Sequence, residues 1–164
     1  VPFGAFRRSL FNQLGGFNEE LQTNEDYEFN TRIRKNGGVV WLDPSIRTVY
    51  LARSNLGELA KQYFRYGYWK LKMLSRFPDT LRWRQALPPL FVASLLLLGI
   101  ISIFIPLLLY LLALEVVLYL AILTVFGAII ARKVHRIGCI IGFPAAIATM
   151  HVCWGAGFLW SLVK

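Results

Sequence analysis

The sequence has few of the residues that build metal centres or disulfides. It contains two cysteines, Cys139 and Cys153, and two histidines, His135 and His151. If the last apolar run is one helix, the cysteines lie about 21 Å apart along its axis, at 1.5 Å per residue. A disulfide needs Cα atoms within about 7 Å of each other. Because no Cys and His spacing typical of a zinc site appears either, we predict no disulfide and no metal ligand in this chain.

Acidic residues are scarce, and they almost vanish from the second half. The formal net charge is +9, and Glu115 is the only charged residue between Ala86 and Ala131. A helix of about 46 residues would be about 69 Å long, roughly twice the hydrocarbon thickness of a membrane. The run must therefore fold back once, and Pro106 is the expected turn. Residues 86–164 are predicted to be an all-α membrane region, with transmembrane helices at about 87–105, 107–130 and 137–163.

Glu115 would lie in the middle of the second span, where an acid is costly and often functional. Two interpretations stay open. In the first the acid serves transport through the membrane, and in the second it is a protonated side chain that is hydrogen-bonded to a neighbouring helix.

Basic residues flank the predicted spans in two clusters. Lys and Arg are concentrated in cytoplasmic loops, and two spans separate the clusters, so both should lie on the cytoplasmic side. The first half would then be cytoplasmic and the C-terminus would face outward. The clusters consist of Lys70, Lys72, Arg76, Arg82 and Arg84 before the first span, and of Arg132, Lys133 and Arg136 after the second.

The start of the chain, VPFGAFRRSLF, lacks the pattern of a signal peptide. We expect the chain to begin inside a domain, and residues 1–54 are predicted to be an α/β fragment. A helix is expected over Arg7–Leu14, stopped by two glycines, and a second one begins at Glu25, capped by Thr23 or Asn24. VVWL (39–42) is predicted to be a strand, DPS a turn, and IRTVYL (46–51) a second strand or an extended return.

Residues 55–85 are predicted to form an amphipathic helix and a linker. Asn55 and Glu58 have the spacing of a capping box, and Gly67 is a possible bend. A basic amphipathic helix before a membrane span is typical of a segment that lies on anionic lipid. The same composition could indicate nucleic acid, but the neighbouring spans argue against it, so we expect anionic membrane lipids as partners and no nucleic acid.

Glu25 and Asp26 open the second helix and raise the main functional question. Acids at a helix N-terminus can be simple capping residues, favoured by the helix dipole. A carboxylate in a cleft can also be a general base. The residues alone leave both interpretations open.

The motifs GAFRR, GGFNE, NEDYEFNTRIRKNGG, VVWLDPS and QYFRYGYWK follow one another before the spans. In this order they resemble the C-terminal part of family-2 glycosyltransferases with a GT-A fold, and most of all the bacterial exopolysaccharide type of succinoglycan biosynthesis. The resemblance covers nearly the whole chain. It implies an enzyme of the bacterial inner membrane that transfers a sugar from a nucleotide-sugar donor to a lipid-linked or polysaccharide acceptor, with inversion at the anomeric carbon.

The resemblance also implies roles for individual residues. Asp26 would be the general base that takes the proton of the acceptor hydroxyl, and Glu25 a supporting acid. QYFRY matches the family's Q-x-x-R-W signature at Gln62, Arg65 and Tyr66, with tyrosine in place of tryptophan. An aromatic face there can stack on a sugar ring, and an arginine can meet a diphosphate. The tyrosine leaves processivity open.

Gly4, Phe6 and Arg7 match the part of the family motif that faces the acceptor. The family's nucleotide-binding half, with its metal-binding D-x-D motif, has no counterpart in this sequence. The divalent metal, Mg or Mn, is therefore expected in that half, with no cofactor held by this chain, and we expect the chain to be inactive alone. The alternatives are a non-catalytic small membrane protein and a component of a transporter or flippase.

Overall fold

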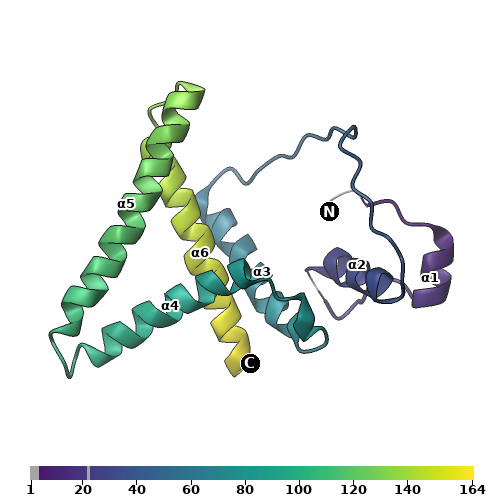
Figure 1. Cartoon of the computed structure of the whole chain (residues 1–164), viewed down its shortest axis with the longest axis horizontal. Coiled ribbons are helices and arrows are strands. Elements are labelled where there is room, and N and C mark those ends of the chain that lie inside the picture. The colour runs from purple at the N-terminus through teal and green to yellow at the C-terminus, as the bar shows by residue number, and fades with distance from the viewer. Residues whose placement is uncertain (1–3, 22) are drawn as a thin grey trace.

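The computed structural model describes residues 4–21 and 23–164 and consists of helices joined by loops (Figure 1). Three short or amphipathic helices precede three long apolar ones. In chain order the elements are α1 (Arg8–Leu14), α2 (Glu25–Lys35), α3 (Leu56–Leu74), the 3-10 helix η1 (Pro78–Thr80), α4 (Trp83–Ile101), α5 (Leu108–Val134) and α6 (Cys139–Val163).

The α/β prediction for residues 1–54 is wrong, because no strand occurs among the residues that the structure describes. The DPS turn does form, since Ser45 donates both its N–H and its hydroxyl to Oδ1 of Asp43, at 2.9 and 2.7 Å. The segments on either side are extended but unpaired, and Trp41 is 81% exposed. A strand is held by hydrogen bonds to a neighbouring strand, and no described segment lies beside these two, so they remain an extended loop.

A small aromatic core joins α1 to α2. Phe29 is completely buried, and its ring centroid lies 4.9 to 5.3 Å from those of Phe6, Phe11 and Phe17. Most of these pairs meet edge to face, a favourable arrangement for aromatic rings. The α1 prediction is confirmed to within one residue, and Gly15, at φ +76°, ends the helix.

Arg32 ties the end of α1 to α2. Its Nε and one terminal nitrogen bind both carboxylate oxygens of Glu28, at 2.7 and 2.9 Å. Its terminal nitrogens also donate to the backbone carbonyls of Leu14 and Gly16, at 2.5 and 2.6 Å. A two-pronged arginine–carboxylate pair is among the strongest hydrogen-bonded contacts in proteins. The arginine therefore holds the glycine turn against α2.

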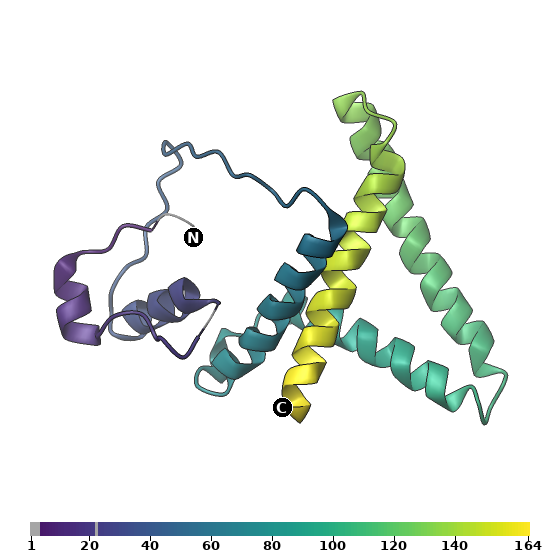
Figure 2. The same cartoon turned by 180° about the vertical axis from the view of Figure 1, so that it is seen from behind.

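Helices α4, α5 and α6 are long and apolar enough to cross a membrane, as predicted. The expected turn at Pro106 lies in the 102–107 connection between α4 and α5, and His135, at φ +55°, ends α5. Large apolar side chains along these helices point outward, including Tyr110 at 77% exposed. Both views show α4, α5 and α6 as the sides of an open triangle (Figures 1 and 2).

Glu115 in α5 accepts a 2.5 Å hydrogen bond from the hydroxyl of Ser94 in α4. One turn further along α5, the hydroxyl of Tyr119 lies 3.1 Å from Nδ1 of His151 in α6. These contacts link the three long helices. Ser94 supplies the neighbouring-helix partner that the second interpretation of Glu115 expects, and both interpretations stay open.

Helix α3 packs along α6, and the two run side by side in both views (Figures 1 and 2). Two glycines allow this close approach. A Cβ on Gly67 would lie 2.1 Å from the carbonyl oxygen of Trp154, and one on Gly157 would lie 2.1 Å from that of Phe64. Small residues let helix backbones approach in this way. Gly67, expected to mark a bend, is therefore a packing residue inside a continuous helix.

Helix α4 crosses α6 in the second half of α6. A Cβ on Gly155 would lie 2.5 Å from the carbonyl oxygen of Pro88. The second basic cluster instead precedes the start of α6 at Cys139. Cys139 is about 24 Å from Gly155 along the helix axis, at 1.5 Å per residue. That both clusters face the cytoplasm stays a prediction, which only a membrane experiment can test.

Candidate functional site

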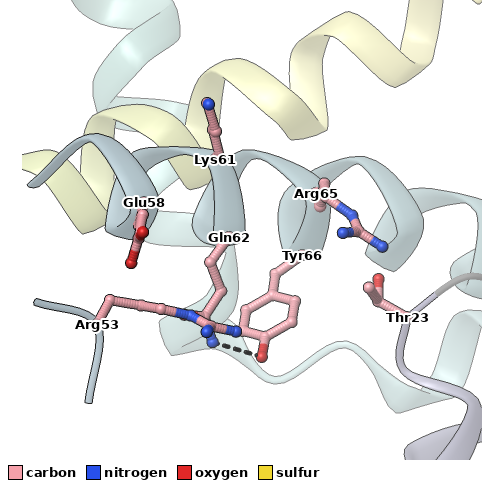
Figure 3. A pocket seen from close by; sticks show the side chains of 7 residues that line it. All are labelled: Thr23, Arg53, Glu58, Lys61, Gln62, Arg65 and Tyr66. Atoms are coloured by element: carbon pink, nitrogen blue, oxygen red, sulfur yellow. Dashed lines mark hydrogen bonds between the residues drawn. The ribbon is translucent and has the colours of Figure 1, made fainter. Parts of the chain in front are cut away.

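A cavity of about 320 Å³ opens beside α3, and we call it the α3 cavity. Three of its lining residues belong to the Q-x-x-R-Y motif, and Figure 3 shows their side chains on one side of the helix. The spacing i, i+3, i+4 brings such residues together on a helix. The remaining wall comes from the same helix, from the loop before it and from the segment before α2. The lining residues are Thr23, Arg53, Glu58, Lys61, Gln62, Arg65 and Tyr66.

Gln62 is the centre of a short hydrogen-bonded chain in this wall. Its Nε2 donates to the hydroxyl of Tyr66 at 2.7 Å, and its Oε1 accepts from Nε of Arg53 at 3.0 Å. The Tyr66 ring also meets that of Tyr63 edge to face at 5.7 Å. The glutamine thus fixes both an aromatic ring and a guanidinium at the cavity wall.

The α3 cavity is positively charged. Arg53, Lys61 and Arg65 outnumber its single acid, Glu58. The start of the helix is capped, because Oδ1 of Asn55 accepts from the N–H of Glu58 at 2.9 Å. This confirms half of the predicted capping box. Planar guanidinium groups suit phosphate oxygens, so the arrangement favours a phosphorylated ligand.

Thr23 brings the start of α2 to this cavity. In Figure 3 its side chain lies across from Arg65. Its buried hydroxyl has no hydrogen-bond partner, so it can serve a ligand, because buried polar groups nearly always find a partner. Glu25 and Asp26 follow two and three positions later, although neither lines the cavity.

The acid pair begins α2 as predicted, but Asn24 does not cap the helix with its side chain. Asn24 adopts a left-handed backbone at φ +67° and makes no side-chain cap bond. Instead Oδ1 of Asp26 accepts from the N–H of Tyr27 at 2.7 Å. Asp26 thus binds the helix terminus locally while standing in a half-buried position. The cap and general-base interpretations are both compatible with this geometry.

The other predicted acceptor residues lie elsewhere. Phe6 is part of the aromatic core with Phe29. Gly4 and Arg7 are exposed near α1, and neither lines the α3 cavity. The structure therefore brings together Gln62, Arg65 and Tyr66 and leaves Gly4, Phe6 and Arg7 outside.

Sequence reasoning missed four lining residues, one of which, Glu58, it had assigned only to the cap of the helix. Lys61 lies one helical turn before Arg65, so its i, i+4 spacing could have revealed it. Arg53 and Thr23 belong to separate loops, and no sequence pattern connects them to α3. Nowhere in residues 4–21 and 23–164 do three or more His, Cys, Asp or Glu side chains gather in a way that could hold a metal ion. The metal inferred from the resemblance thus stays a prediction.

Comparison with known proteins points to glycosyl transfer. Residues 4–164 match glycosyl transferase family 21. An 82-residue stretch is 34% identical to the succinoglycan biosynthesis protein ExoA of Rhizobium meliloti (strain 1021). That stretch is 50% of this chain and spans only 25% of the relative's length. No solved structure matches the chain.

Proposed function

The chain belongs to glycosyl transferase family 21. We therefore propose that it is part of a membrane-bound, inverting glycosyltransferase. The enzyme would transfer a sugar from a nucleotide-sugar donor to a lipid-linked or polysaccharide acceptor in exopolysaccharide biosynthesis. The name of the relative supports the last point, because that protein acts in succinoglycan biosynthesis. The resemblance pointed to family 2, whereas the family that matches is family 21.

One observation carries the proposal most directly. The α3 cavity is lined by Gln62, Arg65 and Tyr66 together with Thr23, whose hydroxyl has no hydrogen-bond partner. Thr23 lies two residues before Glu25, the first residue of the acid pair. A sugar ring could lie against the Tyr66 face while the phosphates meet the cations around it. The same wall is exposed to solvent at Arg65 and Lys61, so a soluble donor can reach it.

The proposed step is a direct displacement. The oxygen of the acceptor hydroxyl attacks the anomeric carbon, and the bond from that carbon to the donor phosphate breaks. The hydroxyl proton passes to the carboxylate of Asp26, and the nucleoside diphosphate leaves with the electron pair. Arg65 and Arg53 would stabilise the charge that develops on the leaving phosphates.

The proposal places the reaction at the cytoplasmic face of a bacterial inner membrane. The three apolar helices support membrane association, and the contact of α3 with α6 holds the cavity wall against the last of them. A lipid-linked acceptor would then reach Asp26 from the membrane. The donor and acceptor sugars are left open.

The decisive experiment compares Asp26→Asn with wild type in the full-length protein. Asparagine keeps the size of aspartate and can still accept from the N–H of Tyr27, and it caps helices about as well as aspartate. A pure capping role would therefore leave transfer and melting temperature nearly unchanged. A general base would lose about 10²–10⁴-fold in rate with the fold intact. The measurement is transfer from radiolabelled nucleotide sugars to membrane lipid extracts.

Glu25→Gln is the matched control, because it removes the neighbouring charge from the same helix end. We expect a much smaller loss of rate for Glu25→Gln than for Asp26→Asn. Equal losses would indicate a general charge effect, and near-normal transfer by Asp26→Asn would show that the acid is only a cap.

A further inference from the structure

The turn that leads into α2 carries two polar side chains that the protein leaves unpaired. Oγ1 of Thr23 and Nδ2 of Asn24 are both buried, and neither has a hydrogen-bond partner among the described residues. Asn24 also adopts a left-handed backbone, at φ +67°, and its side chain does not cap the helix. Because buried polar groups are nearly always paired in folded proteins, two unpaired ones in succession point to a ligand that completes the turn.

Thr23 is the member of this pair that lines the α3 cavity. Figure 3 shows its side chain across from Arg65, with Gln62 and Tyr66 on the same helix as the arginine. Arg65 is exposed, and exposed side chains change rotamer rapidly, so the arginine can turn toward a phosphate of a ligand. The cavity then gives that ligand a route to the hydroxyl of Thr23.

The hydroxyl of Thr23 differs in chemistry from the other polar groups of the cavity. The guanidinium and ammonium groups only donate hydrogen bonds, which suits phosphate oxygens, and the carboxylate of Glu58 only accepts them. Gln62 is already bonded through both of its amide atoms, to Tyr66 and to Arg53. A threonine hydroxyl both donates and accepts. The hydroxyl groups of a sugar do the same, so Thr23 is complementary to a sugar hydroxyl.

The place of Thr23 in the chain indicates which part of the ligand it meets. Three residues separate it from Asp26, the proposed general base, so their Cα atoms are at most about 11 Å apart. A group bound by Thr23 therefore lies near the proposed reacting atoms. In a nucleotide sugar these atoms belong to the sugar and its phosphate, whereas the nucleobase is at the far end of the molecule.

We infer that Thr23 is a specificity-determining residue, whose hydroxyl forms a hydrogen bond with one hydroxyl group of the transferred sugar. The inference rests on the proposed glycosyl transfer and adds to it the residue that selects the sugar. A site that pairs a buried polar group with a substrate hydroxyl discriminates against analogues that lack this hydroxyl, because the buried group is then left unpaired.

The test compares wild type, Thr23→Val and Thr23→Ser in the full-length protein. Valine keeps the shape of threonine without the hydroxyl, and serine keeps the hydroxyl. Transfer to membrane lipid extracts is first measured with radiolabelled UDP-glucose, UDP-galactose and GDP-mannose. The donor that wild type uses best is then compared with analogues that each lack one sugar hydroxyl.

We expect Thr23→Val to lower kcat/KM for the best donor roughly tenfold, the value of one hydrogen bond, and Thr23→Ser to stay close to wild type. One deoxy analogue should react equally well with wild type and Thr23→Val, because it has no hydroxyl for Thr23 to bind. The other analogues should still distinguish the two proteins. This pattern identifies the sugar hydroxyl that Thr23 reads.

Thr31→Val is the matched control, because it makes the same change in a threonine that does not line the α3 cavity. The hydroxyl of Thr31 already donates to the carbonyl oxygen of Tyr27 at 2.9 Å, so Thr31→Val should leave kcat/KM close to that of wild type. Thr23→Val should melt at the wild-type temperature or above it, because it removes an unpaired buried group. A lower melting temperature would show that the hydroxyl serves the fold, and it would overturn the inference.

Two kinetic results would also overturn it. The first is a wild-type kcat/KM in Thr23→Val, and the second is an equal loss for every deoxy analogue, which would place the hydroxyl against a phosphate or the acceptor. In both cases wild type still transfers sugar, so the proposed function stands. If wild type transfers none of the three sugars, the proposed function fails and this inference fails with it.

Discussion

Replacing Gly157 by alanine should separate α3 from α6. The added Cβ would lie 2.1 Å from the carbonyl oxygen of Phe64 and 2.9 Å from its carbonyl carbon. Ordinary contacts of a methyl group need well over 3 Å, so the helices must move apart by about 1 Å. Overpacking of this kind costs about 1–3 kcal/mol, more than the roughly 0.5–1 kcal/mol that alanine gains over glycine as a helix former.

Gly142→Ala is the matched control, because Gly142 lies in the same helix and its Cβ would meet nothing within 4 Å. It should leave stability unchanged or raise it slightly. Thermal unfolding of the purified full-length protein in detergent measures both variants. Gly157→Ala should melt several degrees lower, because 1 kcal/mol corresponds to about 2–4 °C in a protein of this size.

A double variant tests the geometry further. Gly67→Ala alone would press on Trp154 in the same interface, at 2.1 Å from its carbonyl oxygen. One outward shift of α3 relieves both clashes, so Gly67→Ala with Gly157→Ala should cost less than the sum of the single changes. Strict additivity, or a Gly157→Ala melt equal to that of Gly142→Ala, would refute the close packing of the two backbones.

Two further predictions concern charge. In the absence of added anions, Lys70→Met should stabilise the protein at pH 7 by about 2 kcal/mol. Burial lowers the pKa of Lys70 to about 8, so charging the lysine in the folded protein costs about 3 kcal/mol. Its contact with the face of the Tyr27 ring offsets about 1 kcal/mol of that cost. The unfolded chain keeps the Lys70 proton up to about pH 10.5, whereas the folded protein releases it near pH 8. The stability of the wild type should therefore rise between these pH values, and Lys70→Met should lack this rise. Equal melting temperatures of wild type and Lys70→Met at pH 7 would contradict the argument. Cysteine labelling of intact cells should find positions beside Arg84 and Arg132 on the same, cytoplasmic side, and labelling from opposite sides would disprove the three-span topology.

The sequence revealed the helices well because their signals are local. The turn around Pro106, the two glycines after α1 and the Asn55 cap each act within a few residues of themselves. The residues of the α3 motif were identified by their resemblance to the family's Q-x-x-R-W signature, and helical spacing then places Gln62, Arg65 and Tyr66 together.

Contacts between distant segments escaped prediction. A β-branched, aromatic segment such as 39–42 has strand propensity, but a strand exists only when another segment pairs with it. Likewise, no local pattern shows that Thr23 and Arg53 reach α3, or that Lys70 becomes buried behind Tyr27. Gly67 was interpreted as a bend because its actual neighbour, Trp154, lies far along the chain.

The pairing of α3 with α6 also sets an order of events during synthesis. Gly67 leaves the ribosome roughly 90 residues before Trp154, which is about 5–20 s at the usual rate of elongation. Throughout that interval, while α4 and α5 are being synthesised, the glycine face of α3 has no α6 to pack against. The motif helix can therefore reach its final place only after α6 has been synthesised. A ribosome that stalls before α6 would leave a nascent chain in which α3 lacks the helix that it packs against.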